Sequence, residues 1–412
     1  MRILFLTQVL PFPLVGGAKI RAYYMLRQLA QNHSVTLISF IRDDDERDSV
    51  DHLRTWCTDV YTIPLRRSWI KNVWALIVSL VRGRPVVIAR DRIQAMESMI
   101  ETVTDAGPYD IVHADQTAMA QYALLATSLQ PETRAILDAH NAMYVMVERQ
   151  ARYLGGWQGP LWRREARLLR EYEAGLISQL AHVLTVSHED EEALLSAQRK
   201  ELGFQQKNKL SVVPICVDAE LPMKAAAADG AQILAIGTMF WPPNVDAVLW
   251  FSEEVLPLIR RQVPGASFTI VGKSPPESVR QLTELPGGAV RVTGFVEDLD
   301  PILRASQVMV VPIRAAGGMR VKILTGWLWG MPIVSTSIGA EGIATRPGEN
   351  ILLADEPESF AKAVISVLTD RQRAASLRHN GRRWVETCYD WRRIYPEIED
   401  LYQTLIESHD RE

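Results

Sequence analysis

Two basic residues beside a pair of glycines are the clearest candidates for chemistry in this sequence. Gly317 and Gly318 are followed by Arg320 and Lys322 in the segment AAGGMRVKIL. Glycines let a backbone come close to a ligand, and the first N–H groups of a helix lack intrahelical partners. Cations are disfavoured at a helix N-terminus, so their presence there indicates a bound anion, such as phosphate. The alternative is that both side chains are solvated at the surface.

The segments around this loop predict how it is held. Gln307–Ile313 is an apolar, β-branched run that is typical of a buried parallel strand. Met319–Trp329 has apolar residues at roughly helical spacing, and Ile333–Thr336 follows as a second strand. This strand–loop–helix–strand unit places the glycine pair where the helix begins. The later turn at Gly339–Gly342 favours an anion site over a solvated surface.

A second glycine pair with nearby basic residues lies close to the N-terminus. The local patterns predict a strand, a helix and a strand at Arg2–Thr7, Lys19–Gln31 and Ser34–Phe40. Gly16 and Gly17 lie in the loop before this helix, and Lys19 and Arg21 lie at its start. The arrangement resembles that of Gly317 to Lys322. Such a start also argues for a parallel sheet.

Polar side chains are predicted at the carboxyl ends of two further strands. Tyr109–His113 and Ala135–Ala139 are apolar strand-like runs. His140 directly follows the second run, and Asp115 lies two residues after the first. Ligands of an open parallel sheet bind at the carboxyl ends of its strands, so Asp115, His140 and His113 are candidate site residues. For each histidine, the alternative is a hydrogen bond within a loop.

The series of alternating strands and helices occurs twice, on either side of the low-complexity segment KAAAADG. The predicted fold class is α/β, with two Rossmann-like doubly wound domains that face each other across a cleft. We expect an N-terminal domain, a linker, a second domain and a C-terminal helix that returns to the first domain. Their predicted bounds are 1–223, 224–230, 231–390 and 391–412.

The composition excludes several other classes of protein. The 412 residues carry a net charge of −4 with a pI near 6.1, so nothing in the whole chain favours nucleic-acid binding. The three cysteines are far apart and form no metal-binding motif, which favours a reducing cytoplasm. The acidic run at 43–46 could bind a metal, but a solvated helix start is the favoured interpretation. We therefore expect neither a metal nor another cofactor.

Residues 66–92 raise the question of membrane contact. A short apolar helix there carries Trp69 and Trp74 near its start and basic residues at both edges, which suits an anionic membrane surface. The alternative is a core helix with a charged rim. The longest apolar run, Val73–Val81, is too short to span a bilayer, and the N-terminus lacks the ordered parts of a signal peptide. We expect a cytoplasmic protein, peripheral at the inner face of the membrane if this helix binds lipid.

The sequence resembles the retaining glycosyltransferases of family 4, also called group 1, over nearly its whole length. The pieces that carry the resemblance are VVPICVD (212–218), IGTMFWPPNVDAVLWF (236–251), VPGASFTIVGKSP (263–275), VRVTGFVEDLDPIL (290–303), VPIRAAGGMRVKIL (311–324) and GMPIVSTSIGAEGI (330–343). The resemblance implies the GT-B fold and transfer of a hexose-like sugar from a nucleoside-diphosphate sugar to a glycan, lipid-linked or small-molecule acceptor, as in polysaccharide biosynthesis. It also implies that no metal is needed, because basic residues and helix N-termini can stabilise a leaving diphosphate.

The resemblance implies that the second domain, 231–390, binds the nucleotide sugar and that the first, 1–223, is on the acceptor side. Together with the strand-end and glycine-loop patterns, it gives the candidate site residues. The candidate catalytic residues are Arg320, Lys322, Asp115 and His140. The candidate substrate-binding residues are Gly16, Gly17, Lys19, Gly237, Asn244, Gly317, Gly318, Met319, Thr325 and Glu341.

One departure from the family pattern concerns two glutamates that normally lie eight positions apart. Gly317 and Thr325 occupy those positions here, so the usual carboxylate partner of the ribose is missing. A neutral hydroxyl contributes about 1 kcal/mol where a charged partner contributes about 1.5–3 kcal/mol. The second class of function is therefore a catalytically degenerate GT-B protein that binds sugar nucleotide or acts as a scaffold.

Overall fold

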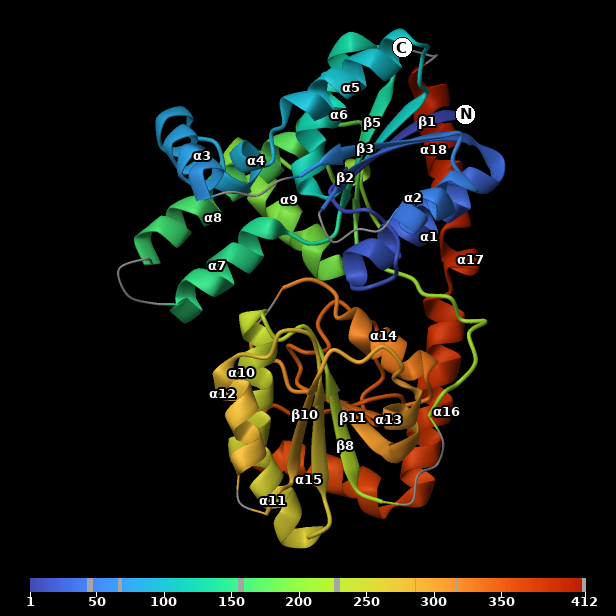
Figure 1. The fold of residues 1–412 in the computed structure, drawn as a ribbon. Helices are drawn as coiled ribbons and strands as arrows, with labels where there is room; N and C mark the ends of the chain where they lie inside the picture. Colours follow the sequence, from blue (N-terminus) through green and yellow to red (C-terminus); the bar gives the residue numbers. More distant parts are fainter. Residues whose placement is uncertain are drawn as a thin grey trace. The chain divides into compact units, whose positions relative to one another are not determined.

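The computed structural model describes residues 1–42, 47–65, 69–154, 159–225, 230–285, 287–315 and 317–409. The chain divides into two compact units (Figure 1). The first unit comprises Met1–Cys216, Gly317–Met319 and Trp391–Glu412, and the second comprises Val217–Ala316 and Arg320–Asp390. The acidic run at 43–46 and most of the predicted linker, at 226–229, lie outside the described residues. The predicted domain bounds therefore stay a prediction.

A seven-stranded parallel sheet forms the centre of the first unit, in the order β3-β2-β1-β4-β5-β6-β7. Its strands are β1 (Arg2–Thr7), β2 (Ser34–Ile41), β3 (Asp59–Pro64), β4 (Ile111–Asp115), β5 (Arg134–Ala139), β6 (His182–Thr185) and β7 (Leu210–Val212). The central strands are buried along almost their whole length, as parallel strands with helices on both faces require. The strand order reverses between β1 and β4, and ligands of doubly wound sheets bind at such a point.

The helices of the first unit pack on this sheet. They are α1 (Gly17–Asn32), α2 (Arg47–Arg54), α3 (Trp69–Arg82), α4 (Val86–Arg90), α5 (Gln94–Asp105), η1 (Thr117–Met119), α6 (Ala120–Leu129), α7 (Met143–Leu154), α8 (Gly159–Gln179), α9 (His188–Leu202), η3 (Lys207–Lys209), α17 (Trp391–Ile394) and α18 (Pro396–His409). The last two come from the end of the chain, and their buried residues Trp391, Tyr395 and Tyr402 join the same hydrophobic core as β1 and α1.

A six-stranded parallel sheet forms the centre of the second unit, in the order β10-β9-β8-β11-β12-β13. Its strands are β8 (Gln232–Ile236), β9 (Ser267–Val271), β10 (Val290–Gly294), β11 (Ser306–Val311), β12 (Ile333–Ser335) and β13 (Leu352–Leu353). The order reverses between β8 and β11. The predicted fold class, α/β with two doubly wound domains, is confirmed.

The helices of the second unit are α10 (Pro242–Trp250), η4 (Phe251–Val255), α11 (Leu256–Gln262), α12 (Glu277–Arg280), η5 (Gln281–Glu284), α13 (Asp300–Ala305), α14 (Val321–Leu328), α15 (Pro357–Thr369) and α16 (Arg371–Cys388). The π-helical turn η4 lies between α10 and α11 and joins them into one helical stretch. The predicted helix at Met319–Trp329 begins two residues later, at Val321, so that Arg320 is its N-cap residue.

Candidate functional site

The strand order of the second unit reverses next to Gly237, which follows β8. A Cβ atom on Gly237 would lie 2.8 Å from Nδ2 of Asn244 and 2.9 Å from Nζ of Lys322. Real Cβ atoms essentially never come so close to other heavy atoms, so a larger residue here would push the side chains of Asn244 and Lys322 aside. The structure therefore brings together three of the predicted site residues, which come from the β8 loop, α10 and α14.

Lys322 has a neutral partner. Its Nζ donates a hydrogen bond of 2.8 Å to Oδ1 of Asn244, and Nδ2 of Asn244 donates to the Thr238 carbonyl at 2.9 Å. The second bond fixes the amide so that its oxygen faces the lysine. Burial and the nearby charge of Arg320 lower the pKa of Lys322 to about 8. Across the described residues, no carboxylate forms an ion pair with Lys322.

Arg320 lies almost entirely within the protein, with 4% of the residue exposed. Its Nη2 donates to the Ile338 carbonyl at 2.7 Å and lies 3.6 Å from Oε2 of Glu341. Both partners belong to the turn that follows β12, which the sequence pattern also singled out. These contacts hold the guanidinium next to the start of α14. Arg320 and Lys322 therefore place two cations beside the first N–H groups of that helix, as an anion-binding site requires.

Backbone conformation explains one of the two glycines that precede this helix. Gly318 has φ +77°, a left-handed value that side chains with a Cβ rarely adopt. Met319 is buried and follows it directly. Gly317 has no positive φ, so its conformation gives no reason for glycine there.

Thr325, which occupies the position of a family glutamate, directs its hydroxyl back to its own helix. Oγ1 donates to the Val321 carbonyl at 3.1 Å. The oxygen of Thr325 can still accept a hydrogen bond from a ligand, but its proton is already engaged. This geometry makes Thr325 a weaker partner for a ribose hydroxyl than a carboxylate would be.

In the first unit, the glycine-pair loop precedes α1. Gly16 is the N-cap residue with φ +90°, and Gly17 is the first helical residue. A Cβ on Gly16 would meet nothing within 4 Å, so the backbone conformation requires glycine and close packing does not. Lys19 is partly exposed in the first turn. The N-terminus of α1 therefore offers free N–H groups beside one accessible cation.

Arg21, the other basic residue of this helix start, has a structural role. Its side chain is fully buried, and its Nε and Nη2 contact the Asp138 carboxylate at 2.7–2.8 Å. Nη1 also donates to the Val213 carbonyl at 2.7 Å. Burial alone would raise the pKa of Asp138, but Arg21 and the imidazoles of His113 and His140 lower that pKa well below its usual range. Arg21 therefore does not share the environment of Lys322, although both follow a glycine pair at the same spacing.

Asp115 and His140, which the sequence placed at two strand ends, lie next to each other in the structure. Nε2 of His140 is 2.8 Å from Oδ1 of Asp115 and 3.8 Å from Oδ2 of Asp138. The Asp115 side chain is fully buried, whereas 9% of the His140 side chain is exposed. The carboxylate therefore holds the imidazole ring in place at the carboxyl edge of the sheet.

The residue after Asp115 has a strained backbone. Gln116 has φ 77° and ψ 150°, a region that glycine occupies almost exclusively. Its backbone N–H donates to the Asp138 carbonyl at 2.9 Å, which helps to fix the strand end in this conformation. Strain of this kind concentrates at functional sites, where the surrounding structure maintains it.

His113, also predicted as a candidate, belongs to the core. Its ring stacks on Phe5 at 4.3 Å, and its Nδ1 lies 2.5 Å from the Tyr402 hydroxyl. His113, Asp115 and Asp138 have potential ligand atoms within 4.8 Å of one another. They do not fit a metal site well, because Arg21 already occupies both oxygens of Asp138 and Tyr402 engages His113.

Sequence reasoning missed Asp138, Gln116 and Tyr402 in this cluster. A single acid inside the apolar run AILDA was a usable signal, because a buried carboxylate needs a charged or hydrogen-bonding partner. Nothing in the sequence predicts the positive φ of Gln116. The contact of Tyr402 with His113 joins residues 289 positions apart, so local pattern could not reveal it.

Two family models match the chain. The model described as Glycosyltransferase Family 4 matches residues 15–221, and the model described as Glycosyl transferases group 1 matches residues 230–370. Among curated proteins, the "uncharacterized 44.6 kDa protein in cps region" of Klebsiella pneumoniae is 21% identical over 400 residues, which cover 94% of this chain and 96% of that protein. The GDP-mannose-dependent alpha-(1-6)-phosphatidylinositol monomannoside mannosyltransferase of Mycobacterium tuberculosis is 30% identical over 159 residues, 35% of this chain and 41% of that protein.

Solved structures share the fold at low sequence identity. Anabaena Alr3699/HepE in complex with UDP and glucose has a TM-score of 0.66 and 15% identity, over 98% of this chain and all of that one. Sucrose-phosphate synthase from Thermosynechococcus elongatus has a TM-score of 0.68 and 16% identity, over 99% of this chain and all of that one. At these identities the likeness establishes the fold alone.

Proposed function

The chain belongs to the family 4 glycosyltransferases, and from this premise we propose that it moves a sugar from a nucleoside-diphosphate sugar to a glycan, lipid-linked or small-molecule acceptor, with retention of anomeric configuration. The single observation that carries the donor assignment is Lys322, a partly buried cation whose partner is the neutral amide of Asn244. A buried charge without a carboxylate is costly unless a ligand supplies the opposite charge.

The donor diphosphate fits the start of α14. Two phosphate groups can accept hydrogen bonds from Lys322, from Arg320 and from the first N–H groups of the helix. Negative charge grows on the diphosphate as the sugar leaves, so these contacts strengthen in the transition state. The same contacts take the place of a divalent metal, and we propose that none is needed. UDP in the HepE complex and GDP-mannose in the name of the mycobacterial relative support a nucleotide-sugar donor.

We propose that Asp115 and His140 of the first unit bind and orient the sugar that is transferred. The Nε2–H of His140 donates to the Asp115 carboxylate, which leaves Nδ1 free to accept a hydrogen bond from a sugar hydroxyl. Family resemblance implies that the acceptor proton passes to an oxygen of the leaving phosphate. No side-chain base is then required, and His140 serves to orient the sugar.

The test is hydrolysis of nucleotide sugars by the intact protein in the presence of EDTA. The panel of donors includes UDP-glucose and GDP-mannose, and the released nucleoside diphosphate is measured. We expect slow release with one donor. Lys322→Ala should lower the rate about 10²-fold, the scale for losing one preorganised electrostatic contact. Lys362→Ala, which removes an exposed lysine from α15 of the same unit, is the matched control and should leave the rate unchanged.

Two results would contradict the proposal. Wild-type turnover by folded Lys322→Ala at saturating donor would refute the phosphate site, and turnover only after Mn²⁺ or Mg²⁺ addition would refute metal independence. The geometry of Thr325 favours one alternative, a degenerate protein that binds sugar nucleotide without turnover. Donor binding by calorimetry with no release from any donor in the panel would establish that alternative.

We also propose contact with an anionic membrane surface through α3. Within the described ranges, no helix is long and apolar enough to cross a membrane. Apolar side chains of α3 are nevertheless strongly exposed, namely Trp69 (74%), Val73 (47%), Trp74 (65%), Ile77 (44%), Leu80 (57%) and Val81 (78%). Arg82 and Arg84 are exposed at the end of this helix, whereas Arg66 and Arg67 lie outside the described residues. Apolar residues with basic neighbours suit an anionic lipid surface.

Vesicle sedimentation tests this contact. The protein should co-sediment with phosphatidylglycerol vesicles, and a Trp69→Ser/Trp74→Ser variant should lose that binding while keeping its circular-dichroism spectrum. Equal and negligible recovery with neutral and anionic vesicles would refute it.

A further inference from the structure

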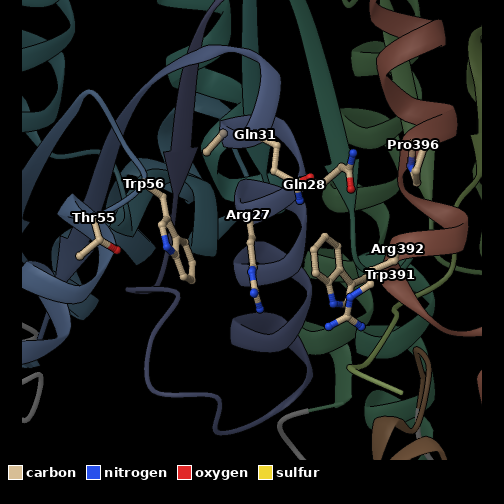
Figure 2. A pocket seen from close by; sticks show the side chains of 9 residues that line it. Arg27, Gln28, Gln31, Thr55, Trp56, Trp391, Arg392 and Pro396 are labelled. Atoms are coloured by element: carbon tan, nitrogen blue, oxygen red, sulfur yellow. The ribbon is translucent and has the colours of Figure 1, made fainter. Parts of the chain in front are cut away.

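A pocket of about 660 Å³ lies within the first unit, away from the carboxyl edge of its sheet (Figure 2). It is bounded by the last turns of α1, the end of α2 and the start of α17. The residues that line it are Arg27, Gln28, Ala30, Gln31, Thr55, Trp56, Trp391, Arg392 and Pro396. Two of them are arginines, two are tryptophans, and none is acidic.

Arg27 lies between the two indole rings. Its guanidinium carbon is 5.4 Å from the centre of the Trp56 ring and 5.1 Å from that of Trp391, and Figure 2 shows the side chain extending between them. A planar guanidinium stacks well on aromatic faces, and each such contact stabilises its position. The indoles contact the faces of the cation and leave its N–H edges available.

The charge of Arg27 is not neutralised by a neighbour. In the described part of the chain, no carboxylate pairs with its guanidinium. Glu399, an acid of the neighbouring helix α18, is already engaged by Gln28 at 2.7 Å and by Asn32 at 3.0–3.2 Å. Arg392 adds a second cation, 4.8 Å from the centre of the Trp391 ring. The pocket therefore holds the guanidinium of Arg27 between two indole rings, with no carboxylate paired to it among the described residues.

We propose that this pocket binds an anionic sugar residue of a saccharide chain, at a site separate from the α14 donor site and the His140 cluster. The guanidinium of Arg27 matches the two oxygens of a carboxylate or phosphate group. Gln31 and Thr55, both exposed in the lining, offer amide and hydroxyl groups to sugar hydroxyls. The choice of a saccharide rests on the proposed glycosyltransferase function, and the pocket would hold an acidic acceptor chain outside the reaction site.

Isothermal titration calorimetry without donor tests the pocket independently of turnover. The probes are trigalacturonic acid, its neutral methyl ester, and galactose 6-phosphate, which separates uronate from phosphate recognition. We expect at least one acidic probe to bind and the ester to bind at least tenfold more weakly. Arg27→Gln should weaken acidic binding about tenfold or more, the loss expected for one charged, bidentate contact. Arg167→Gln, an exposed arginine of α8 in the same unit, should change nothing.

The following results would overturn the proposal. They are equal affinity for the acid and its ester, no binding of any acidic probe, or unchanged binding by folded Arg27→Gln. If Arg27→Gln fails to fold, the wild-type comparison of acid with ester still decides the matter. If no donor in the panel is hydrolysed but the acid still binds in an Arg27-dependent way, the enzymatic function is rejected and the pocket proposal stands.

Discussion

The two glycine-pair loops carry basic residues at the same spacing, from Gly16 to Arg21 at the start of α1 and from Gly317 to Lys322 at the start of α14. In the first unit, the last cation is Arg21, which is fully buried against the Asp138 carboxylate. In the second unit, the last cation is Lys322, whose partner is the amide of Asn244. The hydrogen-bonded carboxylate of Asp138 commits Arg21 to the fold, whereas the neutral amide of Asn244 positions Lys322 and leaves its charge for a ligand.

Loss of Arg21 should have the largest effect of the three predictions. Arg21→Ala leaves Asp138 as an uncompensated buried charge, so we expect the free energy of unfolding of the first unit to fall by about 3–5 kcal/mol. Urea denaturation measures this change. Arg54→Ala is the control, because Arg54 forms an exposed ion pair with Asp51 and should contribute about 0–1 kcal/mol.

A double variant sharpens this prediction. Arg21→Met combined with Asp138→Leu removes both charges, and it should recover much of the stability that Arg21→Ala loses. If Arg21→Ala kept wild-type stability but lost donor hydrolysis, Arg21 would be a ligand-binding cation like Lys322, and the contrast between the two loops would be refuted.

The sequence predicted the doubled strand–helix series because apolar runs and glycine turns are local signals. It also placed Asp115 and His140 at the carboxyl ends of strands, where ligands of a parallel sheet bind, but it did not predict that their side chains would meet. It could not show that Arg21 and Lys322 have different environments, because their partners are far away in the sequence. Asp138 lies 117 positions after Arg21, and Asn244 lies 78 positions before Lys322. The pocket around Arg27 was equally hidden, since its second indole, Trp391, comes from the end of the chain.

Replacing Asn244, the neutral partner of Lys322, by aspartate should give Lys322 a carboxylate partner, as Arg21 has in the first unit. In the wild type, Lys322 has a pKa of about 8, so it carries its charge below that pH and loses it above. The KM for donor should therefore rise as the pH passes through 8. In Asn244→Asp, a carboxylate would raise the pKa of Lys322 and move this rise to higher pH. The new negative charge should also raise KM about tenfold at pH 7, because it repels the diphosphate.

The control for this variant is Asn380→Asp. Asn380 lies on α16 of the same unit, and its amide also donates to a backbone carbonyl, that of Glu349. It should therefore reproduce the structural cost of losing such a bond without moving the pH profile. An unshifted profile in folded Asn244→Asp would show that Asn244 does not set the charge of Lys322.

The smallest expected effect is a change in stability caused by backbone strain at Gln116, which Gly318 does not share. Gly318 and Gln116 have the same φ of 77°, but only Gly318 adopts it without a Cβ penalty. Gln116→Gly should relieve about 1–3 kcal/mol of strain and lose about 0.5–1 kcal/mol through the freer unfolded chain, a net gain of about 1 kcal/mol. Urea denaturation measures this gain, and Gln116→Ala is the control because alanine keeps the Cβ. Equal stability of the Gly and Ala variants would mean that the backbone at Gln116, beside Asp115, is not strained.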